Sequence, residues 1–251
     1  MPKTLLEIDG VSLSFLRDNV TFKVIDDISF SVYDNEFLSI IGPSGCGKST
    51  LIRMIAGLIK PSSGKIFYRG NQIEHPSSKI SLVFQNFALL PWLTALDNVK
   101  LALDNTSLSE YDKQIRSMEM LDKVNLKGFE HAYPGEMSGG MKQRVGIARA
   151  VASRPEILLM DEPFSSLDEL TASQLRGEII YMLRNRRISV KSVIMVSHNI
   201  DEVASLSDRV IVMSKPPSKI KDRLVIEEKY PRDIKSRKMG SVISRLYSDL
   251  Y

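Results

Sequence analysis

A glycine-rich segment at residues 42–50 carries the strongest chemical signal, because it matches the pattern G-x-x-x-x-G-K-[ST]. Glycines let the backbone fold tightly enough to direct N–H groups at phosphate oxygens, and a helix that begins there adds its positive dipole end. In such a loop the lysine reaches the β- and γ-phosphates of a nucleotide, and the serine hydroxyl ligates Mg²⁺. We therefore predict a phosphate-binding loop made of Gly42, Pro43, Ser44, Gly45, Cys46, Gly47, Lys48, Ser49 and Thr50.

Two carboxylates follow the apolar run ILLM at residues 157–160. A buried strand that ends at Asp161 can deliver this carboxylate, through water, to the Mg²⁺ of a bound nucleotide. Glu162 would then lie near the γ-phosphate, where it can orient and deprotonate the attacking water. Taken alone, the pattern also fits a strand followed by a solvated acidic turn. The phosphate-binding loop in the same chain favours the catalytic interpretation.

A second anion site is predicted at Ser138, Gly139 and Gly140, which precede a helical pattern at residues 141–152. A serine followed by two glycines at a helix start offers a hydroxyl, exposed N–H groups and a helix dipole. Such a triplet alone is more typical of a flexible helix cap. Its place one helix before the carboxylates favours a role with phosphate.

Strands and helices must position these groups. Apolar and polar residues alternate at 5–14 and 24–33, as in half-buried strands. Shorter and more apolar runs, typical of strands buried on both faces, lie at 37–41, 80–84, 157–160, 193–197 and 210–213. Helical spacing follows the phosphate-binding loop and returns from about 94 to 152. This alternation predicts a parallel sheet covered by helices, with the interval 94–152 inserted as a helical lobe.

The combination of motifs resembles the ATP-binding subunit of ABC transporters. The chain carries, in this order, GPSGCGKST, a glutamine after an apolar strand (Gln85), MSGGMKQR, ILLMDEP, SSLD and a histidine after another apolar strand (His198). The resemblance covers roughly residues 4–214. It implies an α/β fold: a P-loop NTPase core with a mostly parallel sheet, an N-terminal antiparallel β portion and an inserted helical subdomain. The expected organisation is one ATP-binding domain, 1–214, followed by a basic tail, 215–251.

The resemblance also implies roles for single residues. In this family two subunits sandwich two ATP molecules head to tail, each between one phosphate-binding loop and the partner's SGG helix. Gln85 would contact the metal and the attacking water, His198 the γ-phosphate, and Asp168 would join the two half-sites. Phe15 matches the position where the family stacks an aromatic ring on adenine, although a core position in a strand is the other interpretation. The implied catalytic residues are Lys48, Gln85, Glu162 and His198, and the implied Mg²⁺ ligands are Ser49, Gln85 and Asp161.

Departures from the family pattern are few. Met137 stands where leucine is usual before SGG, a change that nearly conserves volume. Met141 stands where glutamine is common, but the serine and the backbone supply the phosphate donors. Because every residue expected to touch ATP is present, we predict an active ATPase that uses ATP and Mg²⁺.

The segment FQNFALLPWLTALDNV at residues 84–99 resembles importers for nitrate, sulfonates and taurine. Its run LLPWL, residues 89–93, has the composition of a protein docking site, which would receive a membrane permease. The alternative is a loop that folds back onto its own core. An extracytoplasmic substrate-binding protein would be an indirect partner, and the substrate itself is not expected to touch this subunit.

Composition and charge narrow the possible partners and location. No apolar run approaches the roughly 18 to 20 residues that span a bilayer, so we expect a peripheral protein that permeases hold at the cytoplasmic side of the membrane. The net charge is +4, but residues 215–251 contain ten Lys or Arg against five Asp or Glu, so the body is nearly neutral. Nucleic acid is therefore not an expected partner, and the tail could lie near an anionic membrane surface.

The single cysteine, Cys46, lies in the phosphate-binding loop, so we expect thiol alkylation to inhibit the protein and bound ATP to protect it.

Two other functions remain to be distinguished. A soluble ABC ATPase of DNA repair or translation would typically carry a long coiled-coil insertion between Lys48 and Ser138, or two cassettes, and neither is present. A P-loop kinase or GTPase would explain the phosphate-binding loop and the carboxylates but not SGG, SSLD or His198.

In the tail, a short amphipathic helix near 239–250 is expected to pack on the body.

Overall fold

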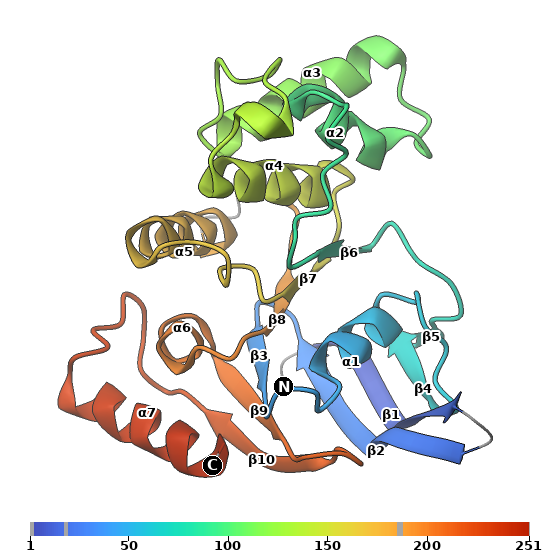
Figure 1. Cartoon of the computed structure of the whole chain (residues 1–251), viewed down its shortest axis with the longest axis vertical. Helices are drawn as coiled ribbons and strands as arrows, with labels where there is room; N and C mark the ends of the chain where they lie inside the picture. The colour runs from blue at the N-terminus through green and yellow to red at the C-terminus, as the bar shows by residue number, and fades with distance from the viewer. Residues whose placement is uncertain (1–2, 18–19, 185–187, 251) are drawn as a thin grey trace. The chain divides into compact units, whose positions relative to one another are not determined.

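The computed structural model describes residues 3–17, 20–184 and 188–250, which fall into two compact units. The first unit comprises Met1–Ser77 and Lys191–Tyr251, and the second comprises Ser78–Val190. Figure 1 shows the elements of both. Among the described residues, no helix combines the length and the apolar character that a membrane span requires.

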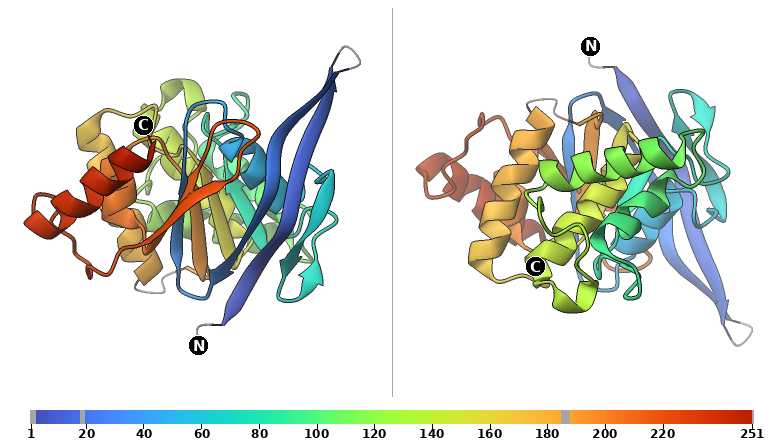
Figure 2. Two further views of the ribbon diagram at one scale, coloured as in Figure 1. Left: turned by 90° about the horizontal axis from the view of Figure 1, so that it is seen from below. Right: turned by 90° about the horizontal axis from the view of Figure 1, so that it is seen from above.

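The first unit contains an antiparallel sheet with strand order β2-β1-β4-β5. Its strands are β1 (Thr4–Arg17), β2 (Val20–Tyr33), β4 (Ser63–Tyr68) and β5 (Asn71–Gln72). The alternating pattern of the first two strands is confirmed, since side chains such as Ile8, Ile28 and Phe30 are buried between polar neighbours. The β1–β2 hairpin extends beyond the other strands of its sheet (Figure 2).

A second sheet of the first unit is mostly parallel. Strand β3 (Phe37–Ile41) pairs in parallel with both β8 (Ser192–Val196) and β9 (Arg209–Met213), and β10 (Ile220–Val225) joins β9 antiparallel. Every residue of β3 and β8 is buried, which confirms the prediction of strands covered on both faces. The helices of this unit are α1 (Lys48–Ile55), α6 (Ile200–Leu206) and α7 (Arg237–Leu250).

The second unit holds the predicted helical lobe. Strands β6 (Ile80–Val83) and β7 (Ile157–Asp161) pair in parallel. Between them come α2 (Ala95–Lys100), α3 (Glu110–Lys123) and α4 (Gly139–Ala152), which contact one another, and α5 (Glu169–Arg184) follows β7 (Figure 1). Thr94, Ser109 and Ser138 cap α2, α3 and α4 by accepting the N–H three residues further on.

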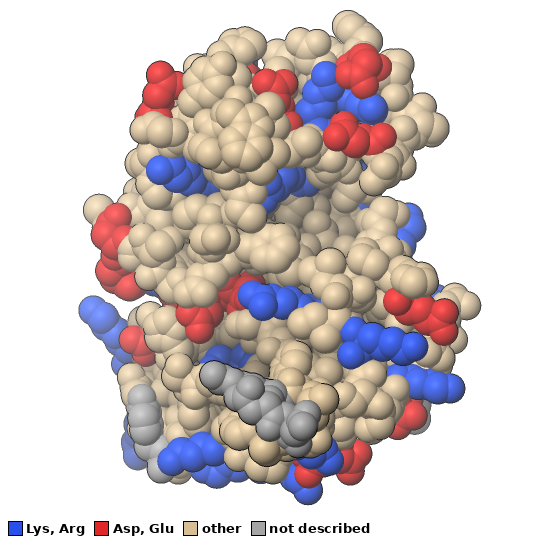
Figure 3. Space-filling model, turned by 45° about the vertical axis from the view of Figure 1, so that its right-hand side comes forward, with Lys and Arg blue, Asp and Glu red and all other residues tan. Residues whose placement is uncertain are grey.

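Charges of both signs share the surface. On the face in Figure 3, Lys and Arg are interspersed with Asp and Glu instead of forming one basic field. In the tail, Arg245 pairs with Asp222 at 2.8 Å and Lys238 with Glu228 at 3.5 Å. Part of the positive charge of residues 215–250 is therefore neutralised within the tail itself.

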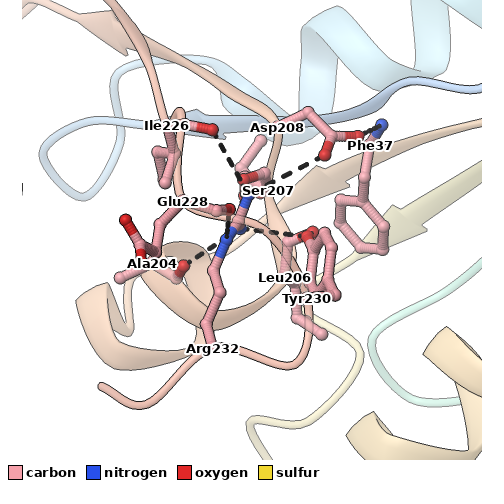
Figure 4. Close-up of polar contacts among 10 residues, drawn as sticks. Phe37, Ala204, Leu206, Ser207, Asp208, Ile226, Glu228, Tyr230 and Arg232 are labelled. Carbon is pink, nitrogen blue, oxygen red and sulfur yellow. Dashed lines mark hydrogen bonds and ion pairs between the residues drawn. The ribbon is translucent and has the colours of Figure 1, made fainter. Parts of the chain in front are cut away.

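The tail is anchored to the first unit at the end of α6 (Figure 4). The Arg232 guanidinium, which is almost fully buried, donates to the carbonyl oxygens of Ala204 and Ser207 and lies 4.1 Å from the centre of the Tyr230 ring. The Tyr230 hydroxyl donates to the carbonyl of Leu206. These groups satisfy the C-terminal carbonyls of α6 and place a cation at the negative end of its dipole.

The amphipathic helix expected near 239–250 forms α7. Its side chains Met239 and Leu246 are buried, and the helix packs against α6, as predicted. Strand β10 was not predicted, although it also belongs to the tail. Its sequence IKDRLV places three consecutive charged residues among three apolar ones, as an edge strand that pairs with β9 on one side can tolerate.

Candidate nucleotide-binding site

The residues predicted to act together are divided between the two units. The first unit contains Phe15, the phosphate-binding loop and His198, and the second contains Gln85, the SGG triplet, Asp161, Glu162 and Asp168.

The phosphate-binding loop connects β3 to α1 and leaves the start of that helix open. Gly47 caps α1 with φ at 95°, a left-handed conformation that suits glycine, and no side chain accepts from the first N–H groups. Gly42 has no room for a side chain, because a Cβ there would lie 2.8 Å from Cys46 Sγ and 2.9 Å from the Met213 carbonyl oxygen. Uncapped N–H groups at a helix start favour an anion.

Lys48 places a cation in the same loop. Its side chain is buried, and Nζ donates to the carbonyl oxygens of Gly42 at 2.8 Å and Pro43 at 3.0 Å. The ammonium is therefore held by the backbone at the start of the loop while Lys48 itself is the first residue of α1. Within nine residues, the loop thus offers a fixed positive charge and uncapped N–H groups at a helix start. Both kinds of group bind phosphate.

The Cys46 thiol points into the protein, contrary to the expectation that it would be open to alkylation. The residue is fully buried, and its Sγ lies against Gly42. Its carbonyl accepts the hydroxyl of the buried Ser218 at 2.6 Å, which fixes this turn of the loop. Burial raises the pKa of the thiol, although the neighbouring Lys48 ammonium opposes this effect. Only the backbone of Cys46 remains suited to contact phosphate.

Phe15 lies on the β1–β2 hairpin and is 47% exposed, so the alternative interpretation as a core residue is wrong. Its ring is open to a ligand, as the resemblance implies. Directly opposite on β2 is Phe22, a second exposed aromatic residue that the motifs did not indicate. It could have been found only from the register of the two strands.

His198 is exposed between two anchored residues at the end of β8. Ser197 donates to Glu202 Oε2 at 2.7 Å and accepts from the Asn199 N–H at 3.0 Å. Asn199 caps α6 by accepting the N–H groups of Asp201 and Glu202. The backbone that carries His198 is thus fixed on both sides, and the residue is exposed.

In the second unit, the structure brings together two predicted catalytic residues. Gln85 Nε2 donates to Glu162 Oε2 at 3.1 Å. Asp161 is the last residue of β7 and is buried, while Glu162 has φ at 48°, a left-handed conformation that is costly for a non-glycine residue. The turn after β7 therefore holds the Glu162 carboxylate beside an amide, where a base for water would be oriented.

The SGG triplet begins α4 as predicted. Ser138 is exposed and accepts the Met141 N–H at 3.2 Å as the helix cap. A Cβ on Gly140 would lie 2.7 Å from Thr171 Cγ2, so glycine permits α5 to approach α4. Asp168 caps the start of α5 by accepting the Thr171 N–H at 3.0 Å. Hydrogen bonds from Thr171 hold the pKa of Asp168 below its ordinary value, and this threonine links two predicted site segments.

Two side chains that the motifs did not indicate fix the backbone of the loop that contains LLPWL. The buried Asn98 accepts from the Leu90 N–H at 2.8 Å and donates to the carbonyls of Leu90, Leu93 and Thr94. Arg149 of α4 donates to the carbonyls of residues 87 and 88. With this backbone fixed, Trp92 is 69% exposed, so its ring does not fold onto the core.

The implied Mg²⁺ ligands fit a hard cation by chemistry. Ser49, Gln85 and Asp161 offer hydroxyl, amide and carboxylate oxygens, the ligands that Mg²⁺ takes, and it keeps nucleotide phosphates and waters as the others. Among the described residues, no group of three or more His, Cys, Asp or Glu could hold a metal ion by itself. A metal that depends on nucleotide phosphates is consistent with both observations.

Comparison with known proteins identifies the family. Residues 25–165 match the model of the ABC transporter family. The nitrate transport protein NasD of Klebsiella oxytoca is 41% identical over 219 residues, which cover 86% of this chain and 82% of the relative. The aliphatic sulfonates import ATP-binding protein SsuB of Bacillus cereus is 42% identical over 217 residues, covering 86% and 83%.

A solved structure supports the same assignment. A dimeric, post-hydrolysis state of an ATP-binding cassette bound to ADP and Pi is 29% identical, with a TM-score of 0.78, over 89% of this chain and 100% of that chain. The α/β fold with its helical lobe is therefore the fold of that cassette. On its motifs, its fold and these similarities, the chain belongs to the ABC transporter family and is an ATP-binding cassette ATPase of its importer type.

Proposed function

We propose that this chain is the ATPase subunit of an importer in which two copies close around two ATP molecules and drive transport through partner membrane permeases. We base the proposal on the phosphate-binding loop, where Lys48 and the uncapped start of α1 lie in one turn. This arrangement favours a polyphosphate, because it supplies a fixed cation and backbone donors together.

In hydrolysis, each site residue would have its own role. Lys48 and the N–H groups of the loop bind the β- and γ-phosphates, and His198 contacts the γ-phosphate. Gln85 orients a water molecule, and Glu162 accepts its proton as the oxygen attacks the γ-phosphorus and the bond to the β–γ bridging oxygen breaks. The hydrogen bond between Gln85 and Glu162 supports their joint role. Mg²⁺, held through Ser49, Gln85 and Asp161, would neutralise charge on the phosphates when bound.

Closure of two copies would couple this chemistry to movement. Each ATP would lie between the phosphate-binding loop of one copy and Ser138, Gly139 and Gly140 of the other, with Asp168 at the junction. The exposed cap of α4 at Ser138 supports this role. Because only the closed pair makes both sets of contacts, ATP favours closure, and loss of the γ-phosphate reopens the interface.

The surface around Trp92 is the proposed permease contact. Asn98 and Arg149 fix the backbone so that this large apolar ring remains exposed, which suits an anchor for a partner protein. The subunit would thereby be held at the cytoplasmic side of the membrane, and a substrate-binding protein outside the membrane would act indirectly. The names of the similar proteins support a small anion or organic molecule as cargo, such as nitrate, a sulfonate or taurine.

Two substitutions test the chemistry separately. Lys48→Ala should weaken ATP binding at least tenfold, because one charged hydrogen-bond partner is worth about 1.5 to 3 kcal/mol. Glu162→Gln should retain ATP affinity and reduce phosphate release by at least a hundredfold, since general-base catalysis contributes about 10²–10⁴. Binding is measured by equilibrium titration and turnover by phosphate release.

The controls are residues of the same type outside the site. Lys60→Ala and Glu119→Gln alter exposed side chains and should leave both quantities unchanged. Unaltered ATP affinity in Lys48→Ala would refute the phosphate-binding loop, and rapid turnover in Glu162→Gln would refute the base. A preference for GTP over ATP would favour the alternative GTPase function.

A further inference from the structure

Phe22 is an exposed aromatic residue that the predicted nucleotide site does not include. It lies on β2 directly opposite Phe15 in the register of the hairpin and is 63% exposed. Directly opposite residues of an antiparallel pair share a face and have Cβ atoms about 4.5–5.5 Å apart. The two rings are therefore neighbours on one face of the hairpin.

The same face leads to the phosphate-binding loop. Leu13 pairs with Ile25, Ser14 with Lys23 and Phe15 with Phe22, with a bulge at residue 24 between the first two pairs. Side chains alternate between faces along a strand, so the Leu13–Ile25 and Phe15–Phe22 pairs lie on one side and Ser14–Lys23 on the other. The rings are thus the next pair along the face that carries Ile25.

Ile25 and Val24 touch the start of α1. A Cβ on Gly47 would lie 3.0 Å from Val24 Cγ1 and 3.2 Å from Ile25 Cγ1, so both side chains pack on the last glycine of the phosphate-binding loop. From Leu13 to Phe15 the strand advances about 7 Å. A molecule whose phosphates bind at the loop could therefore extend along this face and reach the two rings.

We propose that Phe22 adds a second aromatic ring to the surface where, by the family resemblance, Phe15 stacks on the purine base of ATP. Phe15 supplies the ring face on which the base stacks, and Phe22 widens this apolar surface from the adjacent strand. Aromatic rings bind a planar base with little preference for its polar edge. The proposal rests on the proposed function, because it requires the phosphates of the nucleotide to bind at Lys48.

Leu16 provides a matched control on the same hairpin. Its register partner is Thr21, so it lies on the opposite face from the two rings, and it is 73% exposed. Leu16→Ala therefore removes an exposed apolar side chain from the same hairpin, as Phe22→Ala does. Unlike Phe22→Ala, it removes nothing from the proposed base site.

Competition titrations of the full-length protein test the base contact. We expect Phe22→Ala to weaken ATP binding about tenfold, which equals about 1.4 kcal/mol, and to leave the affinity for inorganic tripolyphosphate unchanged. Leu16→Ala should leave both affinities unchanged. Phe22→Tyr keeps an aromatic ring and should bind ATP as tightly as the wild-type protein does. Equal weakening of ATP and tripolyphosphate in Phe22→Ala, or an ATP affinity equal to that of Leu16→Ala, would overturn the proposal.

A spectroscopic variant keeps the test decisive if Phe22→Ala does not fold. Trp92 is the only tryptophan of the chain, so Trp92→Phe with Phe22→Trp gives a single probe at the proposed site. Its fluorescence should change with ATP and not with tripolyphosphate, and a signal that ignores ATP would contradict the base contact. Failure of the proposed function looks different, since Lys48→Ala would then bind tripolyphosphate as tightly as the wild-type protein does.

Discussion

Lys48 and Cys46 lie two positions apart in the phosphate-binding loop, and both are buried, but burial has opposite consequences for them. The Lys48 ammonium donates to two loop carbonyls, which hold it where a phosphate would bind. The Cys46 thiol has lost water without gaining a strong partner, and its pKa is raised. The first side chain is therefore suited to chemistry, and the second to packing.

Cys46 should react slowly with thiol reagents in the folded protein. The thiolate is the reactive form, so a raised pKa and full burial both lower the rate of alkylation. We expect labelling by iodoacetamide at pH 7.5 to be at least tenfold slower in native protein than in urea-unfolded protein, measured by mass spectrometry. Native labelling as fast as in the unfolded protein would show that the thiol is accessible.

Some site residues can be predicted from sequence motifs, and others reach the site only through the tertiary structure. Lys48, Glu162 and Ser138 follow from residue types at fixed spacings, because phosphate and water chemistry restrict those positions. Phe22 and Thr171 do not, since Phe22 depends on strand register and Thr171 on the close approach of two helices. The inward orientation of the Cys46 thiol could not be predicted either, because motif spacing fixes a backbone position and not a side-chain direction.

Among the elements, α6 connects the tail with the predicted site residue His198. Asn199 caps its start immediately after His198, and Arg232 and Tyr230 bind the carbonyls at its end (Figure 4). Asp208, just beyond the helix, also accepts the N–H of Phe37 at the start of β3, the strand that leads into the phosphate-binding loop. The tail therefore stabilises the part of the first unit that carries His198.

Removal of this anchor should destabilise the protein. Arg232→Ala would leave buried carbonyls of α6 without donors, and we expect the free energy of unfolding to fall by about 2 to 3 kcal/mol. This corresponds to a drop in Tm of roughly 5 to 10 °C, measured by differential scanning calorimetry. The exposed Lys238→Ala should change Tm by no more than about 2 °C. A Tm for Arg232→Ala within that range would show that the anchor contributes little.

The strands and helices were predictable to different degrees. Alternation identified β1 and β2, and continuous apolar runs identified β3 and β8, because burial on one or two faces leaves those patterns in the sequence. Strand β10 lies at a sheet edge and has three consecutive charged residues, 221–223, at its centre, so its sequence resembles an exposed tail. Its pairing with β9 is decided by tertiary packing.

At the scale of the whole molecule, each unit carries only part of the predicted chemistry. The phosphate-binding loop and His198 belong to one unit, while Glu162 and the SGG triplet belong to the other. In the proposed mechanism ATP must therefore engage residues of both units and of a second copy before hydrolysis. The mixed charges of the surface in Figure 3 suit association with other proteins more than with a polyanion.

ATP-dependent dimerisation of Glu162→Gln tests this account most directly. The substitution removes the proposed base and keeps the groups that bind phosphate, so closed pairs should accumulate instead of turning over. Sedimentation velocity should show a monomer without nucleotide and a dimer with ATP, and Glu162→Gln combined with Lys48→Ala should remain monomeric in both. A Glu162→Gln protein that binds ATP and stays monomeric at every concentration would contradict the proposal that two copies close around the nucleotide.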